Sequence, residues 1–254
     1  MSHFSSNSSV SKSGALYLYG RHPVTAAINN PNRQISVLYA TKDTYPETAE
    51  LCRRAQRPSS LIKLVDRKEI EKLLPAEAVH QGFAAQVKPL DSVSLEEICA
   101  AADQYESCHL LILDQVTDPQ NIGAIIRSCV AFNALALIVQ DKNSPIESGA
   151  MAKASAGMIE LLPIVRVTNL ARALETLKKS GFWIIGMDGY AKTTIDKMNK
   201  SGKTAIIMGS EGKGMRRLIE ESCDSTVRLP ISEKVESLNV STAAAITLYE
   251  LNKR

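Results

Sequence analysis

The chain has 254 residues, 44% of them hydrophobic, and a formal net charge of +3, so it is long enough for one large or two modest domains with a filled core. It contains no apolar run near the ~20 residues that cross a bilayer, which excludes a protein with a membrane-spanning helix. Its five cysteines and four histidines are scattered and include no CxxC pair, which argues against a metal site and predicts reduced thiols.

Composition divides the chain into four parts. Residues 1–13 are polar and rich in serine, without the apolar core of a secretory signal, and they predict a disordered leader on a soluble, cytoplasmic protein. Residues 14–88 and 107–254 are mildly basic modules, whereas the linker between them, 89–106, holds five acidic side chains and no basic one. Two basic modules fit a protein whose lobes bind one polyanion.

The first module alternates short apolar strands with helices that end at proline or asparagine. The expected strands are 15–19, 35–40, 61–65 and 83–87, and the expected helices are 22–29, 47–57 and 67–74. This pattern predicts a small α/β domain. Three arginines lie on the second helix, Arg53, Arg54 and Arg57, and a solvated helix face is favoured there over an RNA contact.

The second module repeats the alternation on a larger scale, after a short helix at 95–102. The expected strands are 110–114, 135–139, 161–165, 183–187, 205–208 and 226–229, and the expected helices are 119–132, 146–157, 169–180, 214–221 and 238–251. Continuous apolar strands such as LLIL and AIIM predict a parallel sheet that is buried on both faces. Such a sheet binds ligands at the carboxyl ends of its strands, so the loops that follow strands are the candidate sites.

The first segment that follows a strand and carries polar residues is LLILDQVTDPQNIGAIIRS, residues 110–128. Asp118 as N-cap and Pro119 at the first helical position start a helix sharply. Asn121 and Arg127 are polar residues within this otherwise apolar helix. Asn121 could simply form a hydrogen bond at the start of the helix, and Arg127 could be an ordinary surface residue. These structural explanations are as good as a functional site for this segment alone.

The second segment is AIIMGSEGKGMRRL, residues 205–218, with three glycines in six positions directly after a buried strand. The backbone N–H groups of such a loop can face a ligand. The spacing fits neither a Walker A loop nor a GxGxxG turn. Glu211 would repel a phosphate, so the loop predicts a cationic or neutral ligand, with a plain turn as the alternative.

The third segment is VRLPISEKVESLNVSTAAAITLYEL, residues 227–251. Ser237 and Asn239 lie at the start of an alanine-rich helix, where both residue types are common caps. The apolar part of this helix would ordinarily belong to the core. Taken alone, the segment therefore has a structural explanation as well as a functional one.

Together the three segments resemble, in order and spacing, the motifs of the SPOUT methyltransferases, in the TrmH/SpoU branch that methylates ribose 2′-hydroxyls. The match consists of N-x5-R, GSEGxG and SLNVS, each after a separate strand. LYGRHPVTAAI at 18–28 and HQGFAA at 80–85 are similar to the N-terminal RNA-binding module of members that methylate a guanosine of 23S ribosomal RNA. The resemblance covers the chain from residue 15 to 254.

The resemblance implies an α/β fold, with a C-terminal parallel-sheet SPOUT domain that contains a deep trefoil knot and a small N-terminal L30e-like domain. It also implies S-adenosylmethionine as the cofactor, no metal ion, structured RNA as the substrate, and a homodimer with the active site at its interface. The residues implied to hold the cofactor, through backbone and apolar contacts, are Gly209, Gly212, Leu229, Ile231, Leu238 and Asn239.

By the same resemblance, Arg127 lies at the 2′-hydroxyl that accepts the methyl group. A guanidinium keeps its proton at neutral pH and is a poor base, so we expect Arg127 to contact the substrate phosphate and stabilise the developing oxyanion, or to pass the proton on if the site favours its release. The other implied catalytic residues orient Arg127 or the ribose and complete the polar wall. They are Asn121, Glu211, Ser237 and Asn239.

One position departs from the family pattern: Glu233 stands where the family usually has glycine, three residues after the proline of the third motif. We expect it to alter the loop 231–236 and the affinity for the cofactor. Three other functions stay open. They are methylation of transfer RNA, a non-catalytic RNA-binding assembly factor of the same fold, and a nucleotide-using α/β metabolic enzyme, which the missing Walker A and GxGxxG patterns disfavour.

Overall fold

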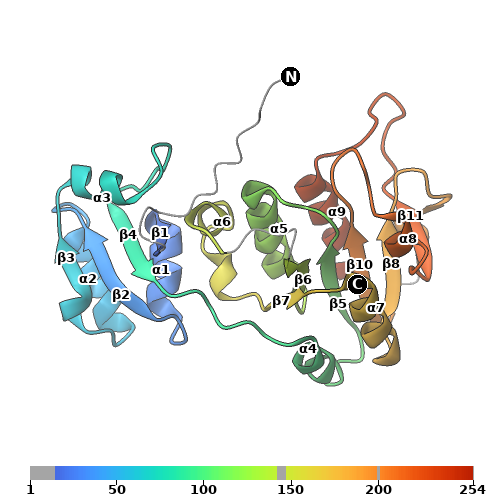
Figure 1. The fold of residues 1–254 in the computed structure, drawn as a ribbon, viewed down its shortest axis with the longest axis horizontal. Helices are drawn as coiled ribbons and strands as arrows, with labels where there is room; N and C mark the ends of the chain where they lie inside the picture. The colour runs from blue at the N-terminus through green and yellow to red at the C-terminus, as the bar shows by residue number, and fades with distance from the viewer. Residues whose placement is uncertain (1–14, 142–146, 199–200, 254) are drawn as a thin grey trace. The chain divides into compact units, whose positions relative to one another are not determined.

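The structure is a computed structural model that describes residues 15–141, 147–198 and 201–253. These residues form two compact units: the first holds 15–90 and 147–160, and the second holds the rest (Figure 1). The expected leader, 1–13, lies outside the described residues. The units differ from the expected domains in two respects. Residues 147–160 group with the first module, although in sequence they connect the second and third strands of the second module. Residues 91–106, most of the expected linker, belong to the second unit.

The first unit is built on a four-stranded sheet. Its elements are β1 (Leu16–Tyr19), α1 (Arg21–Asn29), β2 (Ile35–Ala40), α2 (Tyr45–Arg54), the 3-10 turn η1 (Ser59–Leu61), β3 (Ile62–Leu64), α3 (Arg67–Leu73) and β4 (Phe83–Val87). The strand order is β1-β4-β2-β3, with β4 antiparallel to both β1 and β2 and β3 parallel to β2. Every strand and helix expected in this module is present within a few residues of its expected position.

The three arginines at the end of α2 have two different roles. Arg53 and Arg54 are exposed and form ion pairs with Glu50 on the same helix. Arg57 donates instead to the backbone carbonyl of Ile28, at 3.1 Å, near the end of α1. The first two therefore belong to a solvated helix face, and the third satisfies a carbonyl that a helix end leaves without a partner.

The connection between β6 and β7 completes the first unit with α6 (Gly149–Ala154) and the turn η3 (Met158–Glu160). The helix α6 packs against β1. At Gly149 the backbones are so close that an added Cβ would lie 2.4 Å from the carbonyl oxygen of Tyr17. Close backbone contact of this kind needs glycine, so the segment is fitted to the first unit.

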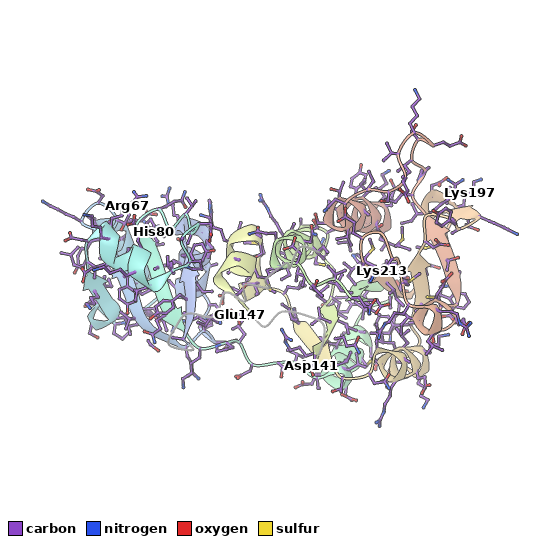
Figure 2. All side chains as sticks on the ribbon, turned by 45° about the horizontal axis from the view of Figure 1, so that its top comes forward. Arg67, His80, Asp141, Glu147, Lys197 and Lys213 are labelled. Atoms are coloured by element: carbon purple, nitrogen blue, oxygen red, sulfur yellow. The ribbon has the colours of Figure 1, made fainter. Side chains whose placement is uncertain are left out.

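A buried ion cluster also fixes this segment. The guanidinium of Arg33, which is fully buried, contacts the carboxylates of Glu147 at 2.6 Å and Glu160 at 2.8 Å. It also donates to the carbonyl of Lys88 at 2.7 Å, and Glu147 accepts from the backbone N–H of Leu90 at 3.0 Å. Figure 2 labels Glu147 beside α6. One cluster thus joins three separate stretches of chain.

The second unit is built on a seven-stranded sheet. Its elements are α4 (Leu95–Ala102), β5 (Cys108–Leu113), α5 (Pro119–Ala131), β6 (Leu137–Gln140), β7 (Ile164–Val167), α7 (Leu170–Lys179), β8 (Trp183–Met187), β9 (Thr193–Thr194), the turn η4 (Ile195–Lys197), β10 (Lys203–Met208), α8 (Arg217–Glu220), β11 (Ser225–Arg228) and α9 (Val240–Asn252). The strand order is β7-β6-β5-β10-β8-β11-β9, and every neighbouring pair is parallel. The prediction of a parallel sheet is confirmed.

Helices cover both faces of this sheet. Figure 1 shows α4 and α7 along one face and α5 and α9 along the other. Leu110, Ile112 and Ile207 point to the first face and pack with the apolar sides of α4, α7 and α8. Leu111 and Ile206 alternate with them and are fully buried too. This double burial explains why the strands are continuously apolar in sequence.

Some elements differ from the expectation. The strand expected at 161–165 begins only at Ile164, and Leu161 is 64% exposed. The two-residue strand β9 was not expected, because so short a run has no sequence period. The sheet order does not by itself trace a knot, so the trefoil knot stays a prediction. Among the described residues, no helix is long and apolar enough to cross a membrane.

Candidate active site

A pocket of about 770 Å³ lies at the carboxyl edge of the seven-stranded sheet. Its walls come from the residues that follow three neighbouring strands, β10, β8 and β11. The lining segments are 187–190, 208–215 and parts of 228–243. The size falls within the roughly 300–1,000 Å³ of small-molecule sites, and the place is where a parallel sheet binds its ligand.

The glycine loop after β10, residues 209–215, folds back on itself at the pocket. Ser210 and Gly214 exchange backbone hydrogen bonds of 3.1 and 2.9 Å. Gly209 is so close to Gly214 that a Cβ added at 209 would lie 2.2 Å from the Gly214 carbonyl carbon. Gly212 and Gly214 have φ angles of 78° and 65°, a region that favours glycine. The three glycines are therefore needed for the path of the backbone.

Gly209→Ala is expected to open this loop, because the added methyl group cannot fit against Gly214. We expect the Kd for S-adenosylmethionine, measured by calorimetry, to rise by about tenfold or more, which corresponds to about 1.4 kcal/mol. Gly189→Ala adds the same methyl group to another pocket residue, where it meets no atom within 4 Å, and should change the Kd less than about threefold. Equal effects of the two substitutions would contradict the prediction.

Most of the residues expected at the site line this pocket. They belong to the second and third segments of the sequence and follow β10 and β11. Those in the pocket wall are Gly209, Glu211, Gly212, Leu229, Ile231, Ser237 and Leu238. The two segments therefore meet in one cavity, as predicted from their positions directly after parallel strands.

The first segment reaches the third through a pair of asparagines. Asn239 is the N-cap of α9, and its side-chain oxygen accepts from the backbone N–H of Ser241 at 2.9 Å. Its amide nitrogen donates to the side-chain oxygen of Asn121 at 3.0 Å. Neither asparagine lines the pocket, but Leu238 and Val240 on either side of Asn239 do. The cap thus fixes the place where α9 meets the pocket wall.

Arg127 is not part of the pocket wall in this chain. It lies on α5 with an exposed side chain, and it makes no hydrogen bond or ion pair with any residue that the structure describes. Its helix packs against α9. A single chain therefore brings the second and third segments together with Asn121, but it does not bring the guanidinium of Arg127 to the cavity.

The sequence reasoning missed one wall of the pocket. This wall consists of Met187, which ends β8, and of Asp188, Gly189 and Tyr190, which follow it; Tyr190 is 89% exposed. A strand was expected at 183–187, so the rule that ligands bind after parallel strands could have found these residues. They contain no glycine cluster or familiar motif, and the signal was therefore weaker than in the other segments.

Carboxylates outnumber cations around the pocket. The charged lining residues are Asp188, Glu211, Lys213, Glu220, Arg228, Glu233 and Glu236. Figure 2 labels Lys213, which belongs to the glycine loop. An excess of negative charge attracts a cationic ligand and repels phosphate, so the pocket fits a sulfonium cofactor. In the described part of the chain, no group of three or more His, Cys, Asp and Glu side chains could hold a metal ion.

Two family models match the chain. One, described as the SpoU rRNA Methylase family, matches residues 109–249. The other, described as RNA 2'-O ribose methyltransferase substrate binding, matches residues 17–93. The first covers more than half of the chain and includes the glycine loop and the asparagine pair, and the second covers the four-stranded unit up to the start of the linker.

Curated relatives and solved structures agree with these matches. The 23S rRNA (guanosine-2'-O-)-methyltransferase RlmB of Pseudomonas syringae is 40% identical, over 92% of this chain and 93% of the relative. RlmB of Pasteurella multocida is 36% identical, over 92% and 96%. The SpoU methyltransferase AviRb from Streptomyces viridochromogenes, solved with the cofactor AdoMet, has a TM-score of 0.78 at 22% identity and covers 95% of this chain and 90% of its own. This last similarity shows the fold.

Proposed function

Because the chain belongs to the SpoU rRNA methylase family, we propose that it transfers a methyl group from S-adenosylmethionine to a ribose 2′-hydroxyl of structured RNA. The observation that carries the proposal is the acidic pocket at the carboxyl edge of the sheet, with the folded glycine loop in its wall. Relatives named as 23S rRNA guanosine methyltransferases support a guanosine of 23S ribosomal RNA as the target, and with it a cytoplasmic location.

For this methyl transfer the protein must mainly position the ribose and the cofactor and assist removal of the hydroxyl proton. When bound, S-adenosylmethionine supplies an electrophilic methyl group on a good leaving group. Gly209, Gly212, Leu229, Ile231 and Leu238 line the pocket and would hold it through backbone and apolar contacts. Asn239, which was expected among them, does not line the pocket and would act by capping α9 beside Leu238. Ser237 and Glu211 are in the pocket wall, where they can hold the ribose or a cationic side chain.

Arg127 would act on the RNA rather than on the cofactor. Its guanidinium can pair with a substrate phosphate and stabilise the charge that develops on the 2′-oxygen. Asn121 lies on the same helix and is held by Asn239, so this asparagine pair can set the helix relative to the pocket. Because Arg127 is outside the pocket of its own chain, we propose that it completes the pocket of a second copy in a homodimer.

The surface of α5 and α9 supports a homodimer. The helix α9 is apolar around most of its circumference, VSTAAAITLYELN, but it buries mainly Val240, Ala244 and Leu248. Ile246 and Tyr249 on its outer side are 38% and 50% exposed. A helix that is apolar all round is usually buried on all sides. A second chain that covers this face would also meet the exposed Arg127 of α5.

A mixture of two variants with little activity tests the shared site. At a cofactor concentration well below the wild-type Kd, we expect Arg127→Ala and Gly209→Ala each to retain about a tenth of wild-type activity or less. Mixing them in equal amounts after subunit exchange should restore about a quarter of wild-type activity, because half of the dimers are mixed and each has one intact site. Light scattering should show two chains per particle. A mixture that stays inactive although the chains exchange would contradict a site that is shared between chains.

The proposed function is tested by mapping 2′-O-methyl groups in ribosomal and transfer RNA from cells with and without the protein. We expect one guanosine of 23S ribosomal RNA to lose its methyl group in the absence of the protein. Loss of a methyl group from a transfer RNA instead would identify transfer RNA as the substrate. No loss, together with no binding of S-adenosylmethionine in calorimetry, would favour the non-catalytic assembly factor.

A further inference from the structure

Asp114 is the first residue after β5, and its side chain is fully buried. Its backbone N–H donates to the carbonyl of Met208, the last residue of β10, at 2.9 Å. Its carboxylate accepts from the backbone N–H of Arg216 and from the Arg216 guanidinium, both at 2.8 Å. Met208 and Arg216 directly flank the glycine loop, so one residue contacts the chain on both sides of it.

The same network extends to a third strand. The guanidinium of Arg216 also donates to the side-chain oxygen of Gln140 at 2.9 Å, and Gln140 is the last residue of β6. A buried carboxylate is costly unless it is paired and hydrogen-bonded, and bonds between ionised groups are stronger than neutral ones. Asp114 therefore holds the end of the loop firmly, from the ends of β5, β6 and β10.

We propose that Asp114, acting through Arg216, is a positioning residue that keeps the glycine loop in the conformation that binds the cofactor. The identity of that ligand rests on the proposed function. Neither residue lines the pocket, so they act through the loop and do not touch the ligand. With Met208 and Arg216 fixed, Gly209 stays packed on Gly214, and the backbone of the loop is ordered before the ligand arrives, which lowers the entropic cost of binding.

If the Asp114–Arg216 ion pair had only a general structural role, a different set of residues would be affected by its loss. If the ion pair only stabilised the sheet, its loss would loosen β5, β6 and β10 as strongly as the loop. A positioning role instead confines the change to residues 209–216 and to ligand affinity. Local opening of this kind is measured by amide hydrogen exchange, which needs no ligand and no activity.

The first test is hydrogen exchange of the ligand-free protein with Arg216→Gln, which removes the charge and shortens the side chain. We expect the amides of 209–216 to exchange at least about tenfold faster and those of β5 and β10 to change by less than about threefold. Arg217→Gln is the matched control: it is the next residue, it loses the same charge, and its exposed side chain forms an ion pair with Glu221 at the surface. It should leave the loop unchanged.

The second test is calorimetry with S-adenosylmethionine and steady-state kinetics. For Arg216→Gln we expect the Kd to rise about tenfold, with kcat at saturating cofactor within about threefold of wild type. Arg216→Lys keeps the positive charge but loses the planar fork of donors, so its Kd should lie between those of the wild type and Arg216→Gln. Asp114→Asn should match Arg216→Gln, and the double variant should be no worse than either.

Two results would overturn the positioning role: unchanged exchange in the loop, or equally faster exchange in the loop and in the strands. Arg216→Lys guards against a variant that does not fold, because it retains a cation beside the buried carboxylate. A loop that loosens as expected in a protein that binds no S-adenosylmethionine even as wild type would support the positioning role of Asp114 and refute the proposed function.

Discussion

Arg127→Ala is expected to lower kcat by about 10²–10⁴-fold, the usual loss when a group that assists proton transfer or stabilises an oxyanion is removed. The affinity for S-adenosylmethionine should change by less than about threefold, because Arg127 is proposed to contact the RNA and not the cofactor. Single-turnover methylation of the RNA substrate measures the first quantity and calorimetry the second. A lower kcat with an unchanged Kd would distinguish a role at the ribose from a role in cofactor binding.

Two further variants sharpen this test. Arg127→Lys keeps the charge but loses the planar fork of donors, so it should recover only part of the rate. Arg172→Ala removes another exposed arginine of the same unit, on α7 at the opposite face of the sheet, and should leave the rate unchanged. If Arg127→Ala retained more than about a tenth of the wild-type rate, the proposed role of its guanidinium would be wrong.

Arg33→Met is expected to lower the free energy of unfolding by about 3–5 kcal/mol, because it leaves two carboxylates without their cation. The side chains of Glu160 and Glu147 are only 1% and 11% exposed, so water cannot replace the guanidinium there. Urea denaturation followed by circular dichroism measures the change. Glu50→Gln breaks exposed ion pairs with Arg53 and Arg54 instead and should cause no change that can be resolved.

The origin of this effect can be tested by removing the charges together. Arg33→Met combined with Glu160→Met and Glu147→Gln leaves no ionised side chain in this cluster, and replacing buried ions with apolar groups of similar size is often neutral. We therefore expect the triple variant to regain most of the lost stability. A triple variant as unstable as Arg33→Met would show that the loss comes from packing and not from unpaired charge.

The secondary structure was largely predictable because local patterns determine it. The strands of the seven-stranded sheet are continuously apolar, and all of those longer than two residues were expected. The helix α5 begins at Pro119 after the cap Asp118, as its sequence indicates. The position of 147–160 was not predictable, because it depends on contacts with Tyr17 and Arg33, which are more than 100 residues away in sequence.

The candidate site was predictable in part for the same reason. Glu211, Ser237 and the glycines of the loop carry a local pattern, and the structure places them in one pocket. The bond between Asn121 and Asn239 joins residues 118 positions apart, and no spacing in the sequence indicates it. The outward position of Arg127 also depends on how α5 packs on α9, which the apolar pattern of the helix leaves open.

The division of the chain has a practical consequence for chimeric enzymes. An exchange of RNA-binding modules between relatives would ordinarily cut once, in the acidic linker. Here such a graft would replace Arg33 and β1 with their counterparts from the relative. It would retain α6, Glu147 and Glu160 of the original chain, which contact them. A working transplant must therefore carry 147–160 along with 15–90, as two pieces of one exchangeable part.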